Sequence, residues 1–408
     1  METTSGTVSD PIADHQAVLV EQPIAPGPPD DRSSQQGGAT RAPGKRHTLD
    51  LLRGTAAMAV AVFHFRGFSN ELGFQIPLGD VGETGVHLFF VLSGFFIGTS
   101  VLSPRVFDSR EFGLNRIFRI LPNYLFSMVL LLFLIDSTPM LKPSGWADIG
   151  THLLLIHGWF PDYRVSITGV YWTLSVEASF YLFMLLAAGL IRRPRSGWWV
   201  ATGMIVIALL YRAALWHVFP REDVMLNFGY KQLPGTLDLF GCGLLVALLM
   251  RSQSFRRSVA RAWVRWLGLL ASLVALTAAL MQYHRYSPAK SYWLKGEMVT
   301  FWPLAFAISA AGVVLFFQQF EPRIGRWLDR SRLAFLGVIS YSIYLYHLVV
   351  ITAFYHAWQR SSGTNPWVVA LLTLVAIIGL SSACYFVIER PFMHLGTRMR
   401  RSHAATAR

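Results

Sequence analysis

Charged residues and cysteine are both scarce in this chain. Only 14% of its 408 residues are Asp, Glu, Lys or Arg, whereas a soluble domain carries about 25%. Together with a hydrophobic content of 53%, this composition excludes an ordinary soluble domain and predicts a polytopic membrane protein. The two cysteines, Cys242 and Cys384, each lie inside an apolar run. Neither a disulfide framework nor a cysteine-ligated metal site is therefore expected.

Several catalytic signatures are also missing. The sequence contains no GxSxG serine-nucleophile motif, no glycine-rich phosphate loop and no HExxH zinc motif. These absences exclude the enzyme classes that depend on such motifs. We expect no metal and no permanently bound cofactor.

Basic residues outnumber acidic ones, and the formal net charge is +13. In a soluble protein this excess would suggest nucleic acid as a partner. Here the basic residues form short clusters between apolar runs, which is the pattern of cytoplasmic loops, so no nucleic-acid partner is expected. Residues 1–46 are rich in Pro, Gly and Ser and lack an apolar run suited to a signal peptide. We predict a disordered cytoplasmic tail there.

Apolar runs of spanning length fill most of the remaining chain. They lie at 48–66, 84–103, 114–135, 170–191, 197–217, 234–250, 264–282, 299–318, 335–356 and 366–388. The sequence therefore predicts an all-α membrane protein, a polytopic bundle of about ten transmembrane helices. The transmembrane domain would cover 47–393, and a basic cytoplasmic tail would follow at 394–408.

The segments that follow the even-numbered runs are basic. Their arginines include Arg105, Arg110, Arg192, Arg193, Arg195, Arg251, Arg256, Arg257, Arg323, Arg326, Arg398, Arg400 and Arg401. Because positively charged loops stay in the cytoplasm, both termini are predicted to be cytoplasmic, in the cell's inner membrane. The shorter apolar run at 147–160 would invert this alternation if it crossed the membrane. We expect it to be a re-entrant or surface helix on the outer side.

The first apolar run carries a polar stripe. Arg53 and His64 are eleven residues apart, which is about three helical turns, so they share one face about 16 Å apart along the axis. Asp50 lies three residues before Arg53, on nearly the same face. These side chains could be interfacial anchors and a polar end to the span. The alternative interpretation is a functional role, because ionisable residues are costly to bury in lipid and those inside membrane helices usually mark functional sites.

Two arginines open the third run. Arg116 and Arg119 are three residues apart and share a helix face on the predicted cytoplasmic side. They could serve only as anchors of the positive-inside type. Beside a polar cavity, the same pair could hold phosphate groups.

The fourth run begins with Trp172 and contains Glu177 about two turns later. A tryptophan at this position is an ordinary interface residue. A lone carboxylate in an apolar helix must be protonated, paired or facing water, so Glu177 is the more informative residue.

In the ninth run, Ser340, Tyr344 and His347 follow one another at intervals of four and three residues. They therefore share a helix face. A hydroxyl, a phenol and an imidazole on one face could bind a polyol. They could equally form a hydrogen-bonded patch between helices.

Taken in order, these motifs resemble the acyltransferase-3 family of integral-membrane acyltransferases. The first helix of that family has an LDLLRG-like start and a later histidine, here His64, and its second helix resembles FFVLSGF at 89–95. Arg116, Arg119 and Pro122 are similar to its RxxR and proline element. YWTLSVE at 171–177, SYSIYLYH at 340–347 and IERPF at 388–392 resemble its later motifs. The resemblance covers residues 47–393.

The resemblance implies transfer of an acyl group, often acetyl, from coenzyme A to a hydroxyl of a carbohydrate, a lipid-linked sugar or a glycosylated natural product. His64 would then be the general base for the acceptor hydroxyl, or an acyl carrier in a two-step reaction. Arg53, with Asp50 beside it, would steady the thioester carbonyl or the developing oxyanion. Glu177 would orient the acceptor hydroxyl or His64.

On the donor side, Arg116 and Arg119 would hold the phosphates of the acyl-CoA co-substrate. Trp172, Tyr344 and His347 would line the pocket for the hydroxylated acceptor. The alternative is a transporter or flippase of a lipid-linked sugar or polyol that catalyses no acyl transfer, since buried Asp, Arg, His and Glu residues also suit a proton relay.

Overall fold

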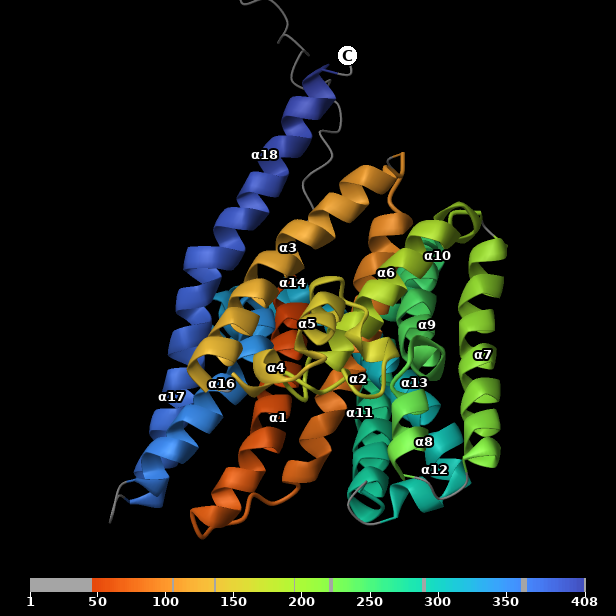
Figure 1. Ribbon diagram of the computed structural model, residues 1–408. Coiled ribbons are helices and arrows are strands. Elements are labelled where there is room, and N and C mark those ends of the chain that lie inside the picture. The colour runs from red at the N-terminus through yellow and green to blue at the C-terminus, as the bar shows by residue number, and fades with distance from the viewer. Residues whose placement is uncertain are drawn as a thin grey trace, which may run out of the picture. The chain divides into compact units, whose positions relative to one another are not determined.

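The computed structural model describes residues 46–104, 106–135, 137–193, 195–219, 223–287, 291–360 and 365–406. The tail predicted at 1–46 lies outside these ranges except for its last residue. From Arg46 onward the described chain is one compact unit (Figure 1). Every regular element within the described ranges is a helix, in agreement with the predicted all-α class.

Each predicted apolar run coincides with one long helix. These helices are α1 (His47–Glu71), α2 (Gly85–Val101), α3 (Ser109–Leu130), α6 (Trp172–Ile191), α7 (Ser196–Val218), α9 (Leu233–Leu249), α11 (Ala262–Arg285), α13 (Trp302–Phe317), α16 (Ser340–Gln359) and α17 (Pro366–Cys384). Among the described residues, eight helices are long and apolar enough to cross a membrane. The two others, α1 and α16, carry the polar stripes noted above, and the count of ten crossings stays a prediction.

Shorter elements connect these helices. They are η2 (Gly79–Thr84), η3 (Leu131–Ile135), α4 (Thr138–Leu141), α5 (Gly145–Leu153), η4 (His157–Trp159), α8 (Asp223–Tyr230), α10 (Gln253–Ala260), η5 (Tyr292–Leu294), α12 (Gly296–Thr300), η6 (Gln318–Phe320), α14 (Glu321–Arg330), α15 (Leu333–Val338), η7 (Tyr385–Glu389) and α18 (Arg390–Thr406). Most of the predicted basic tail belongs to α18, where Gly396 packs against the Phe118 ring of α3.

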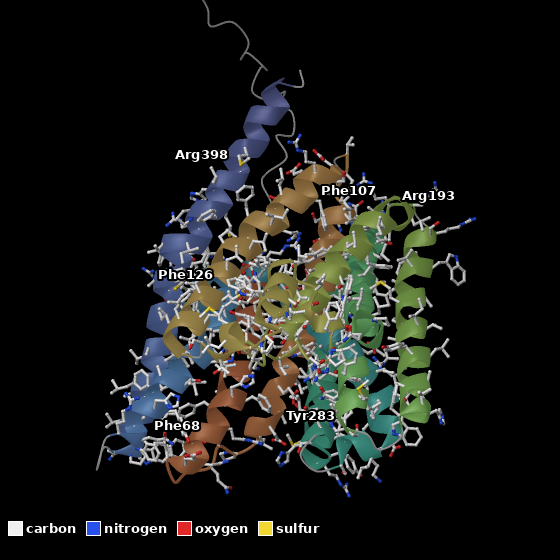
Figure 2. All side chains as sticks on the ribbon, viewed as in Figure 1. Phe68, Phe107, Phe126, Arg193, Tyr283 and Arg398 are labelled. Atoms are coloured by element: carbon white, nitrogen blue, oxygen red, sulfur yellow. The ribbon has the colours of Figure 1, made fainter. Side chains whose placement is uncertain are left out.

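The predicted basic segments gather at one end of the helices. Arg193 and Arg398, from two of these segments, lie at the upper end of the view together with Phe107 (Figure 2). Phe68 and Tyr283, near the C-terminal ends of α1 and α11, lie at the lower end (Figure 2). These labelled residues therefore lie at the ends of the helices at which the charge pattern places them.

The centre of the bundle depends on close backbone contact between α2 and α9. A Cβ atom added to Gly94 would lie 2.1 Å from the carbonyl oxygen of Phe240, and one added to Gly243 would lie 2.1 Å from that of Val91. Small residues at such crossings allow the van der Waals packing that drives helix association in lipid. A buried ion pair joins α9 to α7: Arg212 donates to both carboxylate oxygens of Asp238, at 2.8 and 2.7 Å.

Replacement of Gly94 with alanine should therefore destabilise the fold by roughly 1–3 kcal/mol, because the new methyl group forces two backbones apart. Gly203→Ala is the matched control, since that helical glycine has open space around its would-be Cβ. Thermal unfolding of both variants in detergent measures the difference. Equal melting temperatures would contradict the close-contact argument.

The segment 147–160, which was predicted not to cross the membrane, packs against the helices. Its α5 helix has nine residues and is about 13 Å long, less than half of the roughly 30 Å hydrocarbon layer. The Tyr124 hydroxyl donates to the carbonyl of His152 at 3.2 Å, and the Gln232 amide donates to that of Gly158 at 2.8 Å. These bonds hold the segment against α3 and α9.

Candidate active site

The packing of α1 against α16 brings two histidines together. The rings of His64 and His347 have centroids 5.1 Å apart and an interplanar angle of 33°. His347 Nδ1 donates to the carbonyl oxygen of Ile343 at 3.1 Å, so in the neutral ring Nε2 carries the lone pair. That nitrogen is buried and has no hydrogen-bond partner among the described residues. The arrangement offers an oriented proton acceptor beside a second imidazole.

Tyr344 joins this histidine pair to the start of α6. Its ring centroid lies 6.0 Å from that of His347. Its hydroxyl lies 2.8 Å from Thr173 Oγ1 and donates to the carbonyl oxygen of Val170, also at 2.8 Å. The phenol therefore fixes the start of α6, and its ring lies near the imidazole. The Ser340 hydroxyl is buried and has no partner among the described residues.

Two charged residues that the sequence did not single out lie near the histidines. The Lys231 ammonium interacts electrostatically with His64 and lies 4.9 Å from the ring centre of Trp172. Its Nζ is 3.8 Å from Glu83 Oε1. Glu83 and Lys231 belong to segments between apolar runs, so helical periodicity gave no signal for them. Trp172 thus contacts a cation, which qualifies its interpretation as a simple interface aromatic.

A second cluster surrounds Arg53. The half-buried guanidinium lies 5.9 Å from the ring centre of Phe96. It interacts favourably with the carboxylates of Asp50, Glu177 and Glu389. Arg119 lies close enough to repel it. Helices α1, α3 and α6 and the π-helical turn η7 therefore each contribute charge to one cluster, which we call the arginine cluster: Asp50, Arg53, Arg116, Arg119, Glu177 and Glu389.

Glu177 is held firmly in this cluster. Its Oε1 accepts hydrogen bonds from the Ser93 hydroxyl, at 2.9 Å, and from the Tyr181 hydroxyl. The same Tyr181 ring supports Arg116, whose guanidinium lies 5.4 Å from the ring centre, and Phe112 supports it at 5.3 Å. The Arg116 Nε is buried without a partner among the described residues. Arg116 thus lies against two aromatic rings, where its planar group is hard to replace.

Glu389 is the cluster residue that the sequence reasoning missed. It is only 2% exposed. It accepts from the Ser342 hydroxyl at 2.9 Å and from the Asn123 amide at 3.4 Å. Its position in the IERPF motif was the available signal, because a carboxylate at the end of an apolar run is costly unless paired. Among the described residues, no group of three or more His, Cys, Asp or Glu side chains could hold a metal.

The histidine pair and the arginine cluster lie at different positions along α1. α1 is continuous from His47 to Glu71, so about 16 Å of helix axis separates Arg53 from His64. Helical side chains also lean toward the N-terminus, which moves the guanidinium away from the imidazole. A substrate that contacts both residues must therefore lie extended along α1.

Two further histidines lie stacked in the segment that connects α3 to α6. His152 and His157 are fully buried, with ring centroids 3.9 Å apart and an interplanar angle of 6°. Burial lowers the pKa of His152 to about 4 and that of His157 to about 3. The cause is the folding of residues 138–171 against the helices, which a hydropathy pattern does not reveal.

Comparison with known proteins agrees with this architecture. The family model described as an acyltransferase domain (Acyl_transf_3) matches residues 46–386. The "Putative membrane-bound transacylase BcsY" of Komagataeibacter xylinus is 28% identical over 364 residues, covering 85% of this chain and 82% of that protein. No solved structure matches the chain.

Two further relatives are longer than this chain. The "Putative peptidoglycan O-acetyltransferase YrhL" of Bacillus subtilis is 27% identical and is covered over 55% of its length. The O-acetyltransferase OatA of Staphylococcus aureus is 22% identical and is covered over 57%. The matches cover 86% and 85% of this chain, respectively. The chain therefore belongs to the acyltransferase-3 family of multi-pass membrane acyltransferases.

Proposed function

We propose that the protein is an O-acyltransferase that moves an acyl group, in the simplest case acetyl, from acyl-CoA to a hydroxyl of a carbohydrate, a lipid-linked sugar or a glycosylated natural product. The observation that carries this proposal is the pair of imidazoles, His64 and His347, between helices that are otherwise largely apolar. Relatives named as O-acetyltransferases support the hydroxyl acceptor.

In the reaction, His64 accepts the proton of the acceptor hydroxyl while the oxygen attacks the thioester carbon. The carbon–sulfur bond then breaks, and the departing thiolate takes the proton from the imidazolium. If His64 is acylated first, the same atoms move in two steps. His347 lies against the His64 ring and keeps an acceptor nitrogen in the site, while Tyr344 and Trp172 line the acceptor side.

We assign the arginine cluster to the donor. Arg53, Arg116 and Arg119 are planar, charged donors that suit phosphate or amide oxygens of acyl-CoA. Asp50, Glu177 and Glu389 keep the three guanidinium groups in position. Because about 16 Å of helix separates Arg53 from His64, Arg53 binds the donor upstream of its thioester.

This assignment requires the end with the basic segments to face the cytoplasm, in the inner membrane. Single cysteines at Gly73 and Asp162 should then react with an impermeant thiol reagent from outside the cell. One at Arg195 should react only after the membrane is opened. Background labelling of the two native cysteines should be low, because Cys242 and Cys384 are buried. Labelling of the Asp162 position only from inside would contradict the proposed orientation.

The proposal is tested with purified protein in nanodiscs, radiolabelled acetyl-CoA and a panel of hydroxylated acceptors. We expect label on an acceptor hydroxyl and stoichiometric release of coenzyme A. Movement of a lipid-linked sugar across proteoliposomes without acyl transfer would instead favour the transporter.

A further inference from the structure

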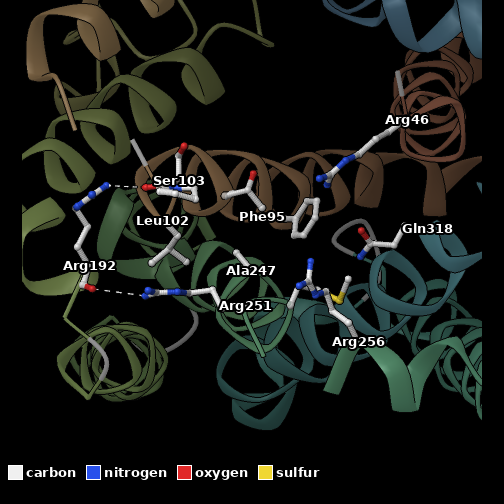
Figure 3. A pocket seen from close by; sticks show the side chains of 12 residues that line it. Arg46, Phe95, Leu102, Ser103, Arg192, Ala247, Arg251, Arg256 and Gln318 are labelled. Carbon is white, nitrogen blue, oxygen red and sulfur yellow. Dashed lines mark hydrogen bonds between the residues drawn. The ribbon is translucent and has the colours of Figure 1, made fainter. Parts of the chain in front are cut away.

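A basic pocket opens beside α2 and α9, lined in part by arginines from two of the basic segments (Figure 3). Its volume is about 620 Å³, within the range of small-molecule sites. It is lined by Arg46, Phe95, Thr99, Leu102, Ser103, Pro104, Arg192, Ala247, Met250, Arg251, Arg256 and Gln318. Four of these residues are arginines, and no carboxylate occurs among the described residues that line it.

Two of the arginines are held by backbone. Arg192 Nη1 donates to the carbonyl oxygens of Val101 and Ser103, at 2.7 and 3.1 Å, and so closes the C-terminal end of α2. Arg251 Nη1 donates to the carbonyl oxygen of Arg192 at 3.5 Å (Figure 3). These bonds fix both side chains at the pocket wall through carbonyl groups.

The side chains of the other two arginines have fewer interactions with the protein. For the guanidinium groups of Arg46 and Arg256 the structure gives no hydrogen bond or ion pair with any described residue. Arg46 lies 5.6 Å from the ring centre of Phe95. The acidic residue that attracts Arg46 is Glu321, outside the pocket lining. Both oxygens of Glu321 already accept hydrogen bonds from His47 and Thr48, at 2.7 to 3.0 Å.

An unpaired donor faces the same space. Gln318 Nε2 is buried and has no hydrogen-bond partner among the described residues. An unsatisfied buried donor costs roughly 1–3 kcal/mol unless a ligand or water accepts from it. Phe95, Leu102, Ala247 and Met250 supply an apolar wall on which a flat ring can lie. The pocket therefore combines positive charge, a spare donor and an apolar surface.

We infer that this pocket binds the phosphorylated adenosine end of acyl-CoA, an inference that rests on the proposed function. Arg46 is the residue immediately before α1, and Arg53 and His64 follow it on the helix at intervals of seven and eleven residues, about 10 and 16 Å along the axis. A donor anchored at Arg46 can thus lead its thiol arm past Arg53 to the histidine pair. A lipid phosphate has the same charge but no flat ring for the apolar wall.

The test compares two donors that differ only in the nucleotide end, acetyl-CoA and S-acetylpantetheine. In the Arg46→Gln, Arg256→Gln double variant, the KM for acetyl-CoA should rise at least about tenfold, from the loss of charge-assisted hydrogen bonds. The KM for S-acetylpantetheine should stay within about twofold. Arg257→Gln is the matched control, because this exposed neighbour on α10 does not line the pocket. Equal effects on both donors, or none, would overturn the inference.

A binding measurement separates this inference from the activity. Adenosine 3′,5′-bisphosphate should bind the wild type in phosphatidylcholine nanodiscs and bind the double variant at least about tenfold more weakly. If phosphatidylglycerol nanodiscs abolish binding to the wild type, the pocket holds lipid phosphate and the inference fails. If binding depends on these arginines but no acceptor is ever acylated, the nucleotide site stands and the proposed function fails.

Discussion

Replacing His64 with alanine should lower the rate of acyl transfer by roughly 10²–10⁴-fold, the usual contribution of a general base. The variant removes the imidazole that α1 places against His347. It leaves the helix itself intact, because alanine is the strongest helix former. Insertion into the membrane and the melting temperature should stay close to those of the wild type. Initial rates with labelled acetyl-CoA measure the loss.

The matched control for this variant is His356→Ala. His356 lies on α16, nine residues after His347, and its side chain is exposed. Its removal should leave turnover unchanged, which excludes a general effect of losing a histidine near the site. Mass spectrometry of the wild type mixed with acetyl-CoA alone distinguishes the two mechanisms, since only an acyl carrier acquires an acetyl group on His64. Near-normal turnover of His64→Ala would refute both mechanisms.

The long helices were predictable because hydropathy is a local property of the chain. Each of the ten predicted runs became a helix. The stripe formed by Arg53 and His64 follows from helical periodicity alone. The contact between His64 and His347 could not be predicted in this way. It depends on which helices pack together, and these two residues are separated by 283 positions in the chain.

Side chains whose neighbours come from distant segments were the ones that sequence reasoning placed poorly. Glu389 enters the arginine cluster through a π-helical turn that no sequence pattern predicted. His152 and His157 are buried because a loop folds inward. Asp238 lies inside an apolar run, and its partner Arg212 comes from a different helix. In each case burial is decided by tertiary packing, and the apolar pattern specifies only that a helix forms.

The basic pocket illustrates the same limit. The sequence groups Arg192, Arg251 and Arg256 with the basic segments, where a positive-inside role is enough to explain them. Their separation along the chain offered no reason to expect a common pocket with Arg46 and Gln318. The charge pattern thus indicated the end of the molecule at which anions could bind, while the pocket itself required the structure.

Replacing Arg53 with lysine should reduce kcat/KM for acyl-CoA by roughly tenfold to a hundredfold, mainly through a higher KM. Loss of one charge-assisted hydrogen bond costs about 1.5–3 kcal/mol, and an ammonium cannot reproduce the planar fork of the guanidinium. Lysine keeps the positive charge among Asp50, Glu177 and Glu389, so the folded cluster should survive. Alanine would instead leave buried carboxylates unpaired and risk unfolding. Initial rates against acyl-CoA at saturating acceptor measure the effect.

Arg66→Lys is the control, since Arg66 is also half-buried on α1 but lies two residues beyond His64, outside the arginine cluster. It should leave the donor KM unchanged.

Whether the Arg53→Lys variant changes kcat or KM decides what Arg53 does. A donor-binding residue acts in the ground state and its loss raises KM, whereas a group that stabilises the oxyanion acts only in the transition state and its loss lowers kcat. Because about 16 Å of helix separates Arg53 from His64, we expect the first pattern. If turnover at saturating donor instead fell by roughly two to three orders of magnitude while the donor KM stayed unchanged, the guanidinium would have to reach the reacting carbonyl. The donor would then not lie extended along α1.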